Sequence, residues 1–489
     1  MNNIMEKAQP KLFTGIDGLD KITYGGFVIG STNLLRGGPG VGKTTVGIHF
    51  LLEGIKQNEG SLFITLGEPV SNIQRNAKQL GLNVENITFL DLSPEPDFFS
   101  KVETYDIFTP AEVEREPTTR QIVETIEKVK PVRVFLDAMT QFKFLSTDNF
   151  QFRKQVLSFL HYLQENKATV LFTTESSTLA PDDDLQFMAD TVINLENTEN
   201  GRFISVSKFR GSDYLSGMHS YKIGQNGINV FPRIVPNKDS ITLTDIVYSF
   251  GVPTIDELLG GGVEKGSIIL LSGPSGVGKT TMAMQLAKSI STHQYKSAYY
   301  TFEEETNMLL KRCHNIGIDS DKSISEGFLD VQKIEPLLYS ADEFSRMVVD
   351  DAINNKLSLV IIDSTSGFKL SLHGQDVVTK MHALCKKLQS FGVTLLLINE
   401  VENITGDFKI TEERLSYLSD TIIFLRYLEI DGKLRKALGV LKKRLSNFEK
   451  TLREFEITSK GIVVGEPLVN LRGILLGVPE WIGDKPEKS

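Results

Sequence analysis

Cysteine is scarce in this chain, and basic residues are fewer than acidic ones. Only Cys313 and Cys385 occur among the 489 residues, too few for a disulfide framework or a cysteine metal cluster. We therefore expect a reducing, cytoplasmic location. Lysine and arginine total 53 against 62 aspartates and glutamates, so the net charge is −9. An acidic chain of this kind is not expected to bind nucleic acid over a broad surface.

Long apolar runs are also missing. No stretch is long enough to span a bilayer, and the opening segment MNNIMEKAQPKLFTG lacks the apolar core of a signal peptide. The chain has instead an ordinary balance of 40% hydrophobic and 24% charged residues, which is enough to build sizeable cores. We expect two or three globular domains and no membrane partner.

The sequence contains a tandem repeat. GGPGVGKTT at 37–45 returns as GPSGVGKTT at 273–281, and SLFITLGEPV at 61–70 returns as SAYYTFEEET at 297–306, with the same offset. Later paired segments keep their order with nearly that offset, which indicates duplication. We predict two domains, 1–236 and 237–489, which join near the polar, proline-containing segment FPRIVPNKDSITL.

Each half is predicted to be an α/β domain. Apolar runs that end at glycine, such as STNLLRG and SIILLSG, are typical of buried strands. The amphipathic stretches that follow the glycine-rich loops, TTVGIHFLLEGIKQ and TTMAMQLAKSISTH, have the pattern of helices. Strands that alternate with helices predict a mostly parallel sheet covered on both faces.

Both glycine-rich loops fit the pattern G-x-x-x-x-G-K-[ST] of P-loop nucleotide sites. In such a loop, backbone N–H groups surround phosphate oxygens at a helix N-terminus. The lysine reaches the β- and γ-phosphates of ATP, and the next hydroxyl binds Mg²⁺. A glycine turn that merely joins strand to helix is the alternative, which two matches in this context disfavour. The predicted ATP-binding loop residues are Gly38, Pro39, Gly40, Val41, Gly42, Lys43, Thr44 and Thr45, and Pro274, Ser275, Gly276, Val277, Gly278, Lys279, Thr280 and Thr281.

Acidic residues follow other predicted strands. Asp137 and Asp363 end apolar runs, where an acid is needed to support the metal alongside Thr44 and Thr280. In the second half, Glu303 and Glu304 also follow a predicted strand and are candidates for the base that orients the nucleophile. Glu303 is also a predicted residue of the metal site, with Thr280 and Asp363. The first half has Gly67 and Glu68 at these positions, so only Glu68 is a candidate there. The alternative is a solvated carboxylate at a helix start.

Pairs of cations recur late in each half. Lys208 and Arg210, and Lys442 and Arg444, follow strand-like segments and are separated by one residue, so each pair lies on one side of its strand. They are either charges that protect an exposed sheet edge or cations that reach the nucleotide of a neighbouring subunit.

These motifs resemble the KaiC family of circadian clock ATPases and kinases over nearly the whole chain. The specific matches are TFEEE, SKFRGS with NGINVFP after it, and ITEERLSYLSDTIIFLRYLEI. The resemblance implies two tandem RecA-like P-loop domains per subunit and a homo-hexameric double ring with ATP at subunit interfaces. It further implies ATPase activity in the first ring, autokinase and autophosphatase activity in the second, and KaiA-like or KaiB-like regulators.

The same resemblance implies roles for individual residues. Glu303 would be the base, with Glu304 its partner, and Ser416 the phosphorylated serine. The four cations Lys208, Arg210, Lys442 and Arg444 would act on the neighbour's ATP.

The chain departs from the family pattern at three positions. Gly67 replaces the base of the first ring, Tyr417 replaces a phosphorylated threonine, and Leu445 replaces a glycine. The C-terminal RGILLGVP resembles a regulatory loop but is followed by a short tail. We therefore expect a mainly structural first ring and a chemically active second ring. Two other functions stay open at this point: an ATP-assembled signalling scaffold with little turnover, and a RecA-like DNA-dependent ATPase.

Overall fold

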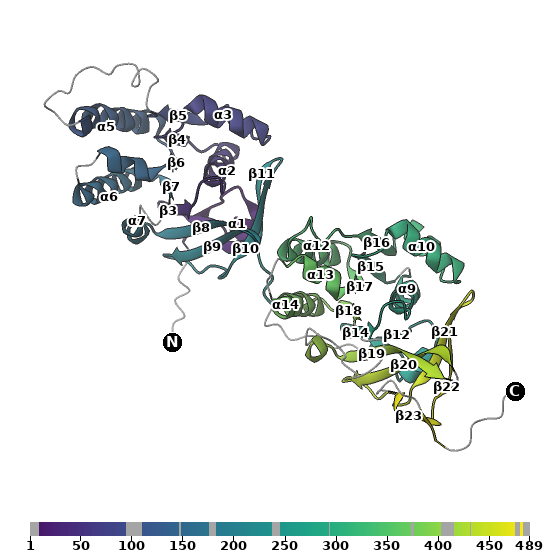
Figure 1. The fold of residues 1–489 in the computed structure, drawn as a ribbon. Coiled ribbons are helices and arrows are strands. Elements are labelled where there is room, and N and C mark those ends of the chain that lie inside the picture. The colour runs from purple at the N-terminus through teal and green to yellow at the C-terminus, as the bar shows by residue number, and fades with distance from the viewer. Residues whose placement is uncertain are drawn as a thin grey trace, which may run out of the picture. The chain divides into compact units, whose positions relative to one another are not determined.

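The computed structural model describes residues 9–93, 110–145, 148–175, 182–236, 245–292, 294–372, 376–401, 415–430, 432–474 and 480–482. The chain divides into two compact units, Met1–Arg233 and Ile234–Ser489 (Figure 1). Parts of the predicted join and of the C-terminal RGILLGVP segment lie outside the described residues. Among the described helices, none is both long and apolar enough to cross a lipid bilayer.

The first unit is built on a nine-stranded sheet with the order β11-β10-β9-β8-β3-β7-β6-β4-β5. Neighbouring strands run parallel from β8 to β5, while β9, β10 and β11 are antiparallel. The strands are β3 (Thr32–Gly37), β4 (Ser61–Thr65), β5 (Thr88–Asp91), β6 (Arg133–Asp137), β7 (Thr169–Glu175), β8 (Thr191–Thr198), β9 (Gly201–Phe209), β10 (His219–Gly224) and β11 (Gly227–Phe231).

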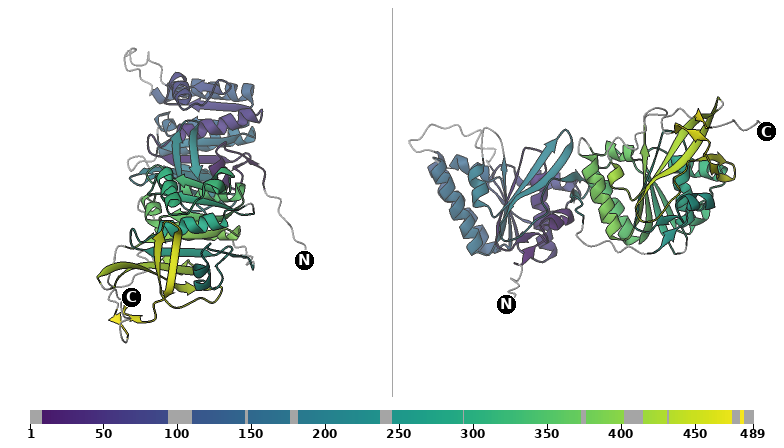
Figure 2. Two further views of the ribbon diagram at one scale, coloured as in Figure 1. Left: turned by 90° about the vertical axis from the view of Figure 1, so that its right-hand side faces the viewer. Right: turned by 90° about the horizontal axis from the view of Figure 1, so that it is seen from below.

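Helices cover both faces of this sheet, because its strands are apolar on both sides (Figure 2). One buried cluster joins the sheet to α1 (Asp17–Ile22), α2 (Lys43–Lys56) and α3 (Val70–Gln79). A second cluster on the other face joins it to α5 (Pro110–Val129), α6 (Asn149–Glu165) and α7 (Asp183–Met188). The strand residues alternate between the clusters: Leu35 belongs to the first and Leu34 to the second.

The second unit repeats this plan with the strand order β16-β15-β17-β18-β14-β19-β20-β21-β22. The strands are β14 (Ile268–Gly273), β15 (Lys296–Thr301), β16 (Leu329–Lys333), β17 (Leu357–Asp363), β18 (Thr394–Glu400), β19 (Thr421–Ile430), β20 (Lys433–Lys443), β21 (Arg453–Thr458) and β22 (Gly461–Pro467). The last three are antiparallel. The expected α/β class with mostly parallel sheets is therefore confirmed in both units.

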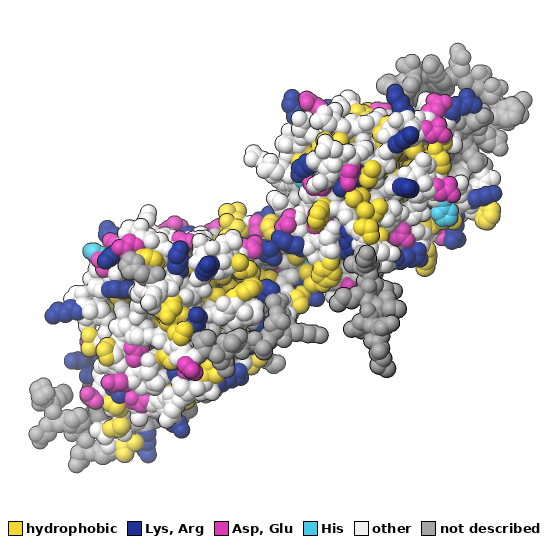
Figure 3. All heavy atoms as spheres, turned by 180° about the vertical axis from the view of Figure 1, so that it is seen from behind, with side chains coloured by type: hydrophobic (Ala, Val, Ile, Leu, Met, Phe, Trp, Pro, Cys, Tyr) yellow, Lys and Arg dark blue, Asp and Glu magenta, His cyan; other side chains and the backbone are white. Residues whose placement is uncertain are grey.

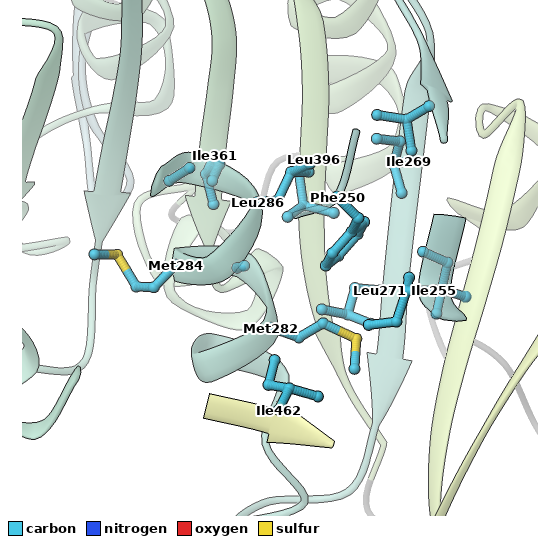
Figure 4. Close-up of a cluster of buried hydrophobic side chains, with 14 of the residues drawn as sticks. Phe250, Ile255, Ile269, Leu271, Met282, Met284, Leu286, Ile361, Leu396 and Ile462 are labelled. Carbon is cyan, nitrogen blue, oxygen red and sulfur yellow. The ribbon is translucent and has the colours of Figure 1, made fainter. Parts of the chain in front are cut away.

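The helices of the second unit divide between the two faces in the same way. On one face lie α8 (Pro253–Leu258), α9 (Lys279–Ile290) and α10 (Thr306–Asn315); on the other lie α12 (Ala341–Asn354), α13 (Thr365–Leu370) and α14 (Val377–Ser390). Figure 4 shows part of the first cluster, where Met282 and Leu286 of α9 pack against sheet residues that include Leu271 and Leu396.

Short elements complete the described chain. Three two-stranded ribbons pair β1 (Lys11–Leu12) with β2 (Phe27–Val28), β12 (Val247–Tyr248) with β13 (Val263–Glu264), and β23 (Leu471–Arg472) with β24 (Glu480–Trp481). The remaining helical turns are η1 (Met139–Leu145), α11 (Asp321–Ser325) and η2 (Leu415–Tyr417).

A histidine in the first unit predicts how its stability depends on pH. His49 of α2 accepts a hydrogen bond from the Ile228 N–H at 3.1 Å through Nε2, and burial lowers the pKa of His49 to about 4 from 6.5. Between these values the unfolded chain binds the proton more strongly, so stability is lost as pH falls from 6.5 toward 4, by about 3 kcal/mol.

His49→Gln is expected to remove this pH dependence, because glutamine cannot titrate and the corresponding position of the second unit already carries Gln285. Hydrogen exchange of the α2 amides, measured between pH 7 and pH 4, tests this. If the α2 amides of His49→Gln lose as much protection on acidification as those of the parent protein, the assignment of this pH dependence to His49 is wrong.

Candidate nucleotide sites

Each P-loop joins a central strand to a helix: β3 to α2 in the first unit and β14 to α9 in the second. Gly42 and Gly278 precede the helices with φ of 95° and 119°, a backbone region that favours glycine. The helix N-termini therefore follow the loops directly, which provides the backbone arrangement of an anion site.

The two loop lysines lie over their own loops. Lys43 Nζ donates to the carbonyl oxygens of Gly37 at 2.7 Å and Gly38 at 2.9 Å, and Lys279 Nζ donates to that of Pro274 at 2.8 Å. Burial lowers the pKa of Lys279, while the carboxylates of Glu400, Asp363 and Glu303 oppose that shift.

A hydroxyl–carboxylate pair stands beside each lysine. Thr44 Oγ1 donates to Asp137 Oδ2 at 2.6 Å, and Thr280 Oγ1 donates to Asp363 Oδ2 at 2.8 Å. Asp137 is the last residue of β6, and Asp363 is the last residue of β17. Each side chain therefore emerges at the carboxyl end of its strand, where the P-loop also lies. Hard oxygen donors of this kind fit Mg²⁺. These four residues would hold the ion, and Glu303, the fifth predicted metal-site residue, lines the same cavity as Thr280 and Asp363.

A further donor to the aspartate differs between the units. Thr173 Oγ1 donates to Asp137 at 2.5 Å, whereas the buried Tyr299 hydroxyl donates to Asp363 at 2.6 Å. Burial raises the pKa of Asp363, and Glu303 adds to this, while the Tyr299 and Thr280 hydroxyls act against it.

In the second unit these groups line a cavity of about 370 Å³. Of the predicted loop residues, Pro274 and Val277 are not among its lining, and Val277 is fully buried in the core. Val41 is likewise buried in the first unit. The cavity is lined by Ser275, Gly276, Gly278, Lys279, Thr280, Thr281, Glu303, Arg312, Ile316, Asp363, Ser364, Glu400, Lys436 and Ile457.

The adjacent acids of the second unit have different surroundings. Glu303 lines the cavity and accepts a hydrogen bond from Ser364 Oγ at 2.6 Å. Glu304 instead binds Arg312 through both carboxylate oxygens, at 3.2 and 2.6 Å. The carboxylate of Glu304 is therefore engaged by a cation, a partner that the sequence did not suggest.

The first unit keeps only the second of these acids. Glu68 accepts a hydrogen bond from Asn76 Nδ2 at 3.2 Å. Burial and then the charge of Asp137 raise the pKa of Glu68. A Cβ at Gly67 would meet Gln141 no closer than 3.6 Å, so the backbone leaves room for a side chain where the acid is missing.

Comparison with known proteins identifies the family. A family model described as the KaiC ATPase matches residues 12–234 and again residues 248–469. The chain belongs to the KaiC ATPase family. The resemblance found in the sequence is thus confirmed.

Curated relatives match over almost the full length. The circadian clock oscillator protein KaiC of Parasynechococcus marenigrum is 30% identical, covering 96% of this chain and 93% of the relative. The same protein of Prochlorococcus marinus is 30% identical, covering 97% and 96%, and that of Synechococcus elongatus is 28% identical, covering 98% and 94%.

The cation pairs of this KaiC-family chain have matching surroundings in both units. Lys208 Nζ donates to the carbonyl oxygens of Gln186, Phe187 and Ala189, and Lys442 Nζ to those of Ser416 and Ser419. The arginines are more open: the side chains of Arg210 and Arg444 are 59% and 51% exposed, with an aspartate at 3.6 and 3.7 Å. Within one chain, the lysines therefore hold the turn before a strand.

Ser416 lies in η2, next to the second cation pair. Lys442 binds its carbonyl oxygen at 3.1 Å, and Arg444 Nη2 binds that of Tyr417 at 3.2 Å. The Tyr417 ring is half exposed and its hydroxyl lies 3.3 Å from His382 Nδ1.

Sequence reasoning missed Tyr299, which donates to Asp363, and several residues that line the cavity. Tyr299, Arg312, Ser364, Glu400 and Lys436 carry no motif, and only strand pairing and helix position bring them to the loop. Glu400 had the clearest available signal, because it ends an apolar run as Asp363 does. Arg312 differs from its repeat counterpart Asn76, which alignment of the two halves would have shown.

Proposed function

We propose that this chain is a hexameric, Mg²⁺-dependent, cytoplasmic ATPase that phosphorylates and dephosphorylates its own Ser416, in circadian-type timing or related signalling. The observation that carries the proposal is the cavity of the second unit, where Lys279, Thr280, Asp363 and Glu303 converge. The printed name of the relatives, circadian clock oscillator protein, supports the timing role. Lys and Arg are interspersed with Asp and Glu on the face in Figure 3, an arrangement that does not favour a DNA-dependent ATPase.

The positions of the side chains supply the chemistry. The Lys279 ammonium neutralises phosphate charge, and Mg²⁺, held by Thr280 and Asp363, adds to this when bound. Glu303 lies in the same cavity and accepts a hydrogen bond from Ser364, so its carboxylate is placed to accept a proton from an attacking water or hydroxyl. Glu304 acts on the site only through Arg312, because both its oxygens bind that guanidinium.

The two units are proposed to differ in activity, with nucleotide binding in the first and catalysis in the second. The first keeps the loop, Lys43, Thr44 and Asp137, which suffice to bind a nucleotide, but glycine stands at position 67 where a base would be. This favours the scaffold interpretation for the first unit alone, with ATP bound there mainly to support assembly.

Glu303→Gln is the direct test of the catalytic assignment. Glutamine preserves the size of the side chain but accepts a proton poorly, and a positioned base contributes roughly 10²–10⁴-fold. We expect steady-state phosphate release by the full chain to fall by about 10²-fold while ATP binding is retained.

Two matched variants make this test specific. Gly67→Glu places the missing acid where a Cβ has room, and is expected to raise phosphate release in a Lys279→Ala background. If Lys43→Ala lowers total turnover as much as Lys279→Ala in an assembled protein, the proposed division of labour is wrong.

Assembly is supported by the exposed arginines. Arg210 follows β9 in the first unit, and Arg444 follows β20 in the second. The lysine two residues earlier, Lys208 or Lys442, already donates to carbonyl oxygens of the same chain. We propose that these arginines reach the ATP of the adjacent subunit and close a six-membered ring.

Native mass measurement in Mg²⁺ATP is expected to give a hexamer. Arg210→Ala should weaken assembly, because it removes the first unit's contact to the neighbouring phosphates, without lowering the thermal stability of the monomer. A monomer that retains ATP, or a ring unaffected by alanine at both arginines, argues against an interfacial site.

Autophosphorylation is supported by the link between Ser416 and the same cations. Lys442 and Arg444 bind the backbone carbonyl oxygens of Ser416 and Tyr417. If Arg444 reaches the nucleotide of a neighbouring subunit, Ser416 therefore lies close to that nucleotide as well. Tyr417 is a poor second acceptor, since its longer phenol cannot share one attack geometry with a serine at about 3–3.5 Å.

After incubation with Mg²⁺ATP, we expect peptide mapping to find one phosphate per subunit, on Ser416. Ser416→Ala should abolish it, while Tyr417→Phe should not. Phosphate on Tyr417, or an unmodified Ser416 in a protein that turns over ATP, would leave an ATPase without this kinase activity.

A further inference from the structure

Arg312 is a cation of the second unit that no loop motif accounts for. It projects from α10 into the cavity, and its Nη1 donates to Thr281 Oγ1 at 3.2 Å. Thr281 is buried and follows Thr280 at the N-terminus of α9. The guanidinium is therefore held next to the residue that follows the predicted metal-binding hydroxyl.

Glu304 fixes the orientation of this guanidinium. Its carboxylate binds Nε and Nη2 of Arg312, a two-point contact that sets the plane of the group. These contacts and the one to Thr281 use three of the five N–H donors. An ion pair of which one side chain is 41% exposed contributes little to stability, so positioning explains this arrangement better.

The corresponding site of the first unit has an asparagine in place of the arginine. Thr45, Glu68 and Asn76 stand where Thr281, Glu304 and Arg312 stand, and Asn76 donates to Glu68 at 3.2 Å. Asparagine is shorter and uncharged. The acid is thus present in both halves of this chain. In the first half the charge of Arg75 acts on Glu68, whereas in the second half the acid hydrogen-bonds Arg312, which lines the cavity.

The place of Arg312 along the cavity indicates which part of a nucleotide it meets. Lys279, Thr280, Asp363 and Glu303 define the end for the metal and terminal phosphate, whereas Ile316 and Ile457 offer an apolar surface for a base. Arg312 donates to Thr281, the residue after Thr280, and Ile316 follows Arg312 by four residues, one past the end of α10. We therefore take the guanidinium to meet the part of the nucleotide between the terminal phosphate and the base. That is the place of the α-phosphate, which is common to ATP and ADP.

We infer that Arg312 binds the α-phosphate of the nucleotide in the second unit and makes this site hold ATP and ADP more tightly than the first. The inference rests on the proposed function, because it takes the cavity to be an ATP site. Charge-assisted hydrogen bonds to phosphate are stronger than neutral ones, so loss of this contact is expected to weaken binding by about tenfold.

The test measures ADP binding to the full chain by calorimetry in a Lys43→Ala background, where only the second site binds. Arg312→Asn, which copies the first unit, should weaken ADP and AMP by about tenfold and leave adenosine unchanged in competition assays. Arg312→Lys should weaken ADP less than Arg312→Asn does. Lys311→Asn, which removes a neighbouring exposed charge, is the matched control and should bind ADP as the parent does.

A double-mutant cycle tests the role of Glu304. Glu304→Gln should weaken ADP in the parent but have little further effect in Arg312→Asn, because the acid acts through the guanidinium. In the reverse direction, Asn76→Arg in a Lys279→Ala background should strengthen ADP binding by the first site several-fold. If Asn76→Arg does not strengthen ADP binding by the first site, the claim that this position makes the two sites unequal is overturned.

The failures can be told apart. Unchanged ADP affinity in Arg312→Asn, or an equal loss for adenosine, overturns the inference while leaving the ATP site in place. A Lys43→Ala parent that assembles but binds no ADP, although Lys279→Ala does, overturns the proposed second site itself and the inference with it.

Discussion

The hydrogen bond from a P-loop threonine to a strand-end aspartate is the constraint on which both nucleotide sites depend. It joins the first turn of α2 to the end of β6, and that of α9 to the end of β17. In the sheet order, β7 lies between β3, which leads into α2, and β6. Likewise, β18 lies between β14, which leads into α9, and β17. The contact therefore requires the correct parallel register of three strands. Once that register exists, the loop lysine, the oxygens of the proposed metal site and the acids after β4 or β15 converge at the carboxyl ends of the parallel strands.

The duplicated units satisfy this constraint with different side chains. The aspartate takes its additional hydrogen bond from Thr173 on β7 in one unit and from Tyr299 on β15 in the other. Phe63 stands where Tyr299 would be in the first unit, and Ile398 stands where Thr173 would be in the second. A buried carboxylate needs such donors. A hydroxyl donor to the aspartate is therefore present in both units, although it comes from a different residue and a different strand in each.

The acids after β4 and β15 differ in number and in their partners. The position of Glu303 faces the cavity and has been lost once, at Gly67, whereas the position of Glu304 is filled in both units. Glu68 and Glu304 each bind a side chain of the following helix, Asn76 or Arg312. In both copies this acid has a hydrogen-bond partner on the following helix, whereas the acid beside it in the second unit bonds Ser364.

The sequence by itself determined the duplication, the α/β class, the two P-loops and the acids at strand ends, because these depend on local patterns: glycine spacing, apolar runs and a constant offset. The tertiary structure alone decided which acid faces the cavity, that Tyr299 supports Asp363, and that Lys442 and Arg444 bind the backbone of the Ser416 turn. It also brought Arg312 to Thr281. Each of these contacts joins residues on different elements, and neighbouring residues such as Glu303 and Glu304 look alike in a sequence. Only the direction in which each side chain leaves the end of β15 gives them different partners.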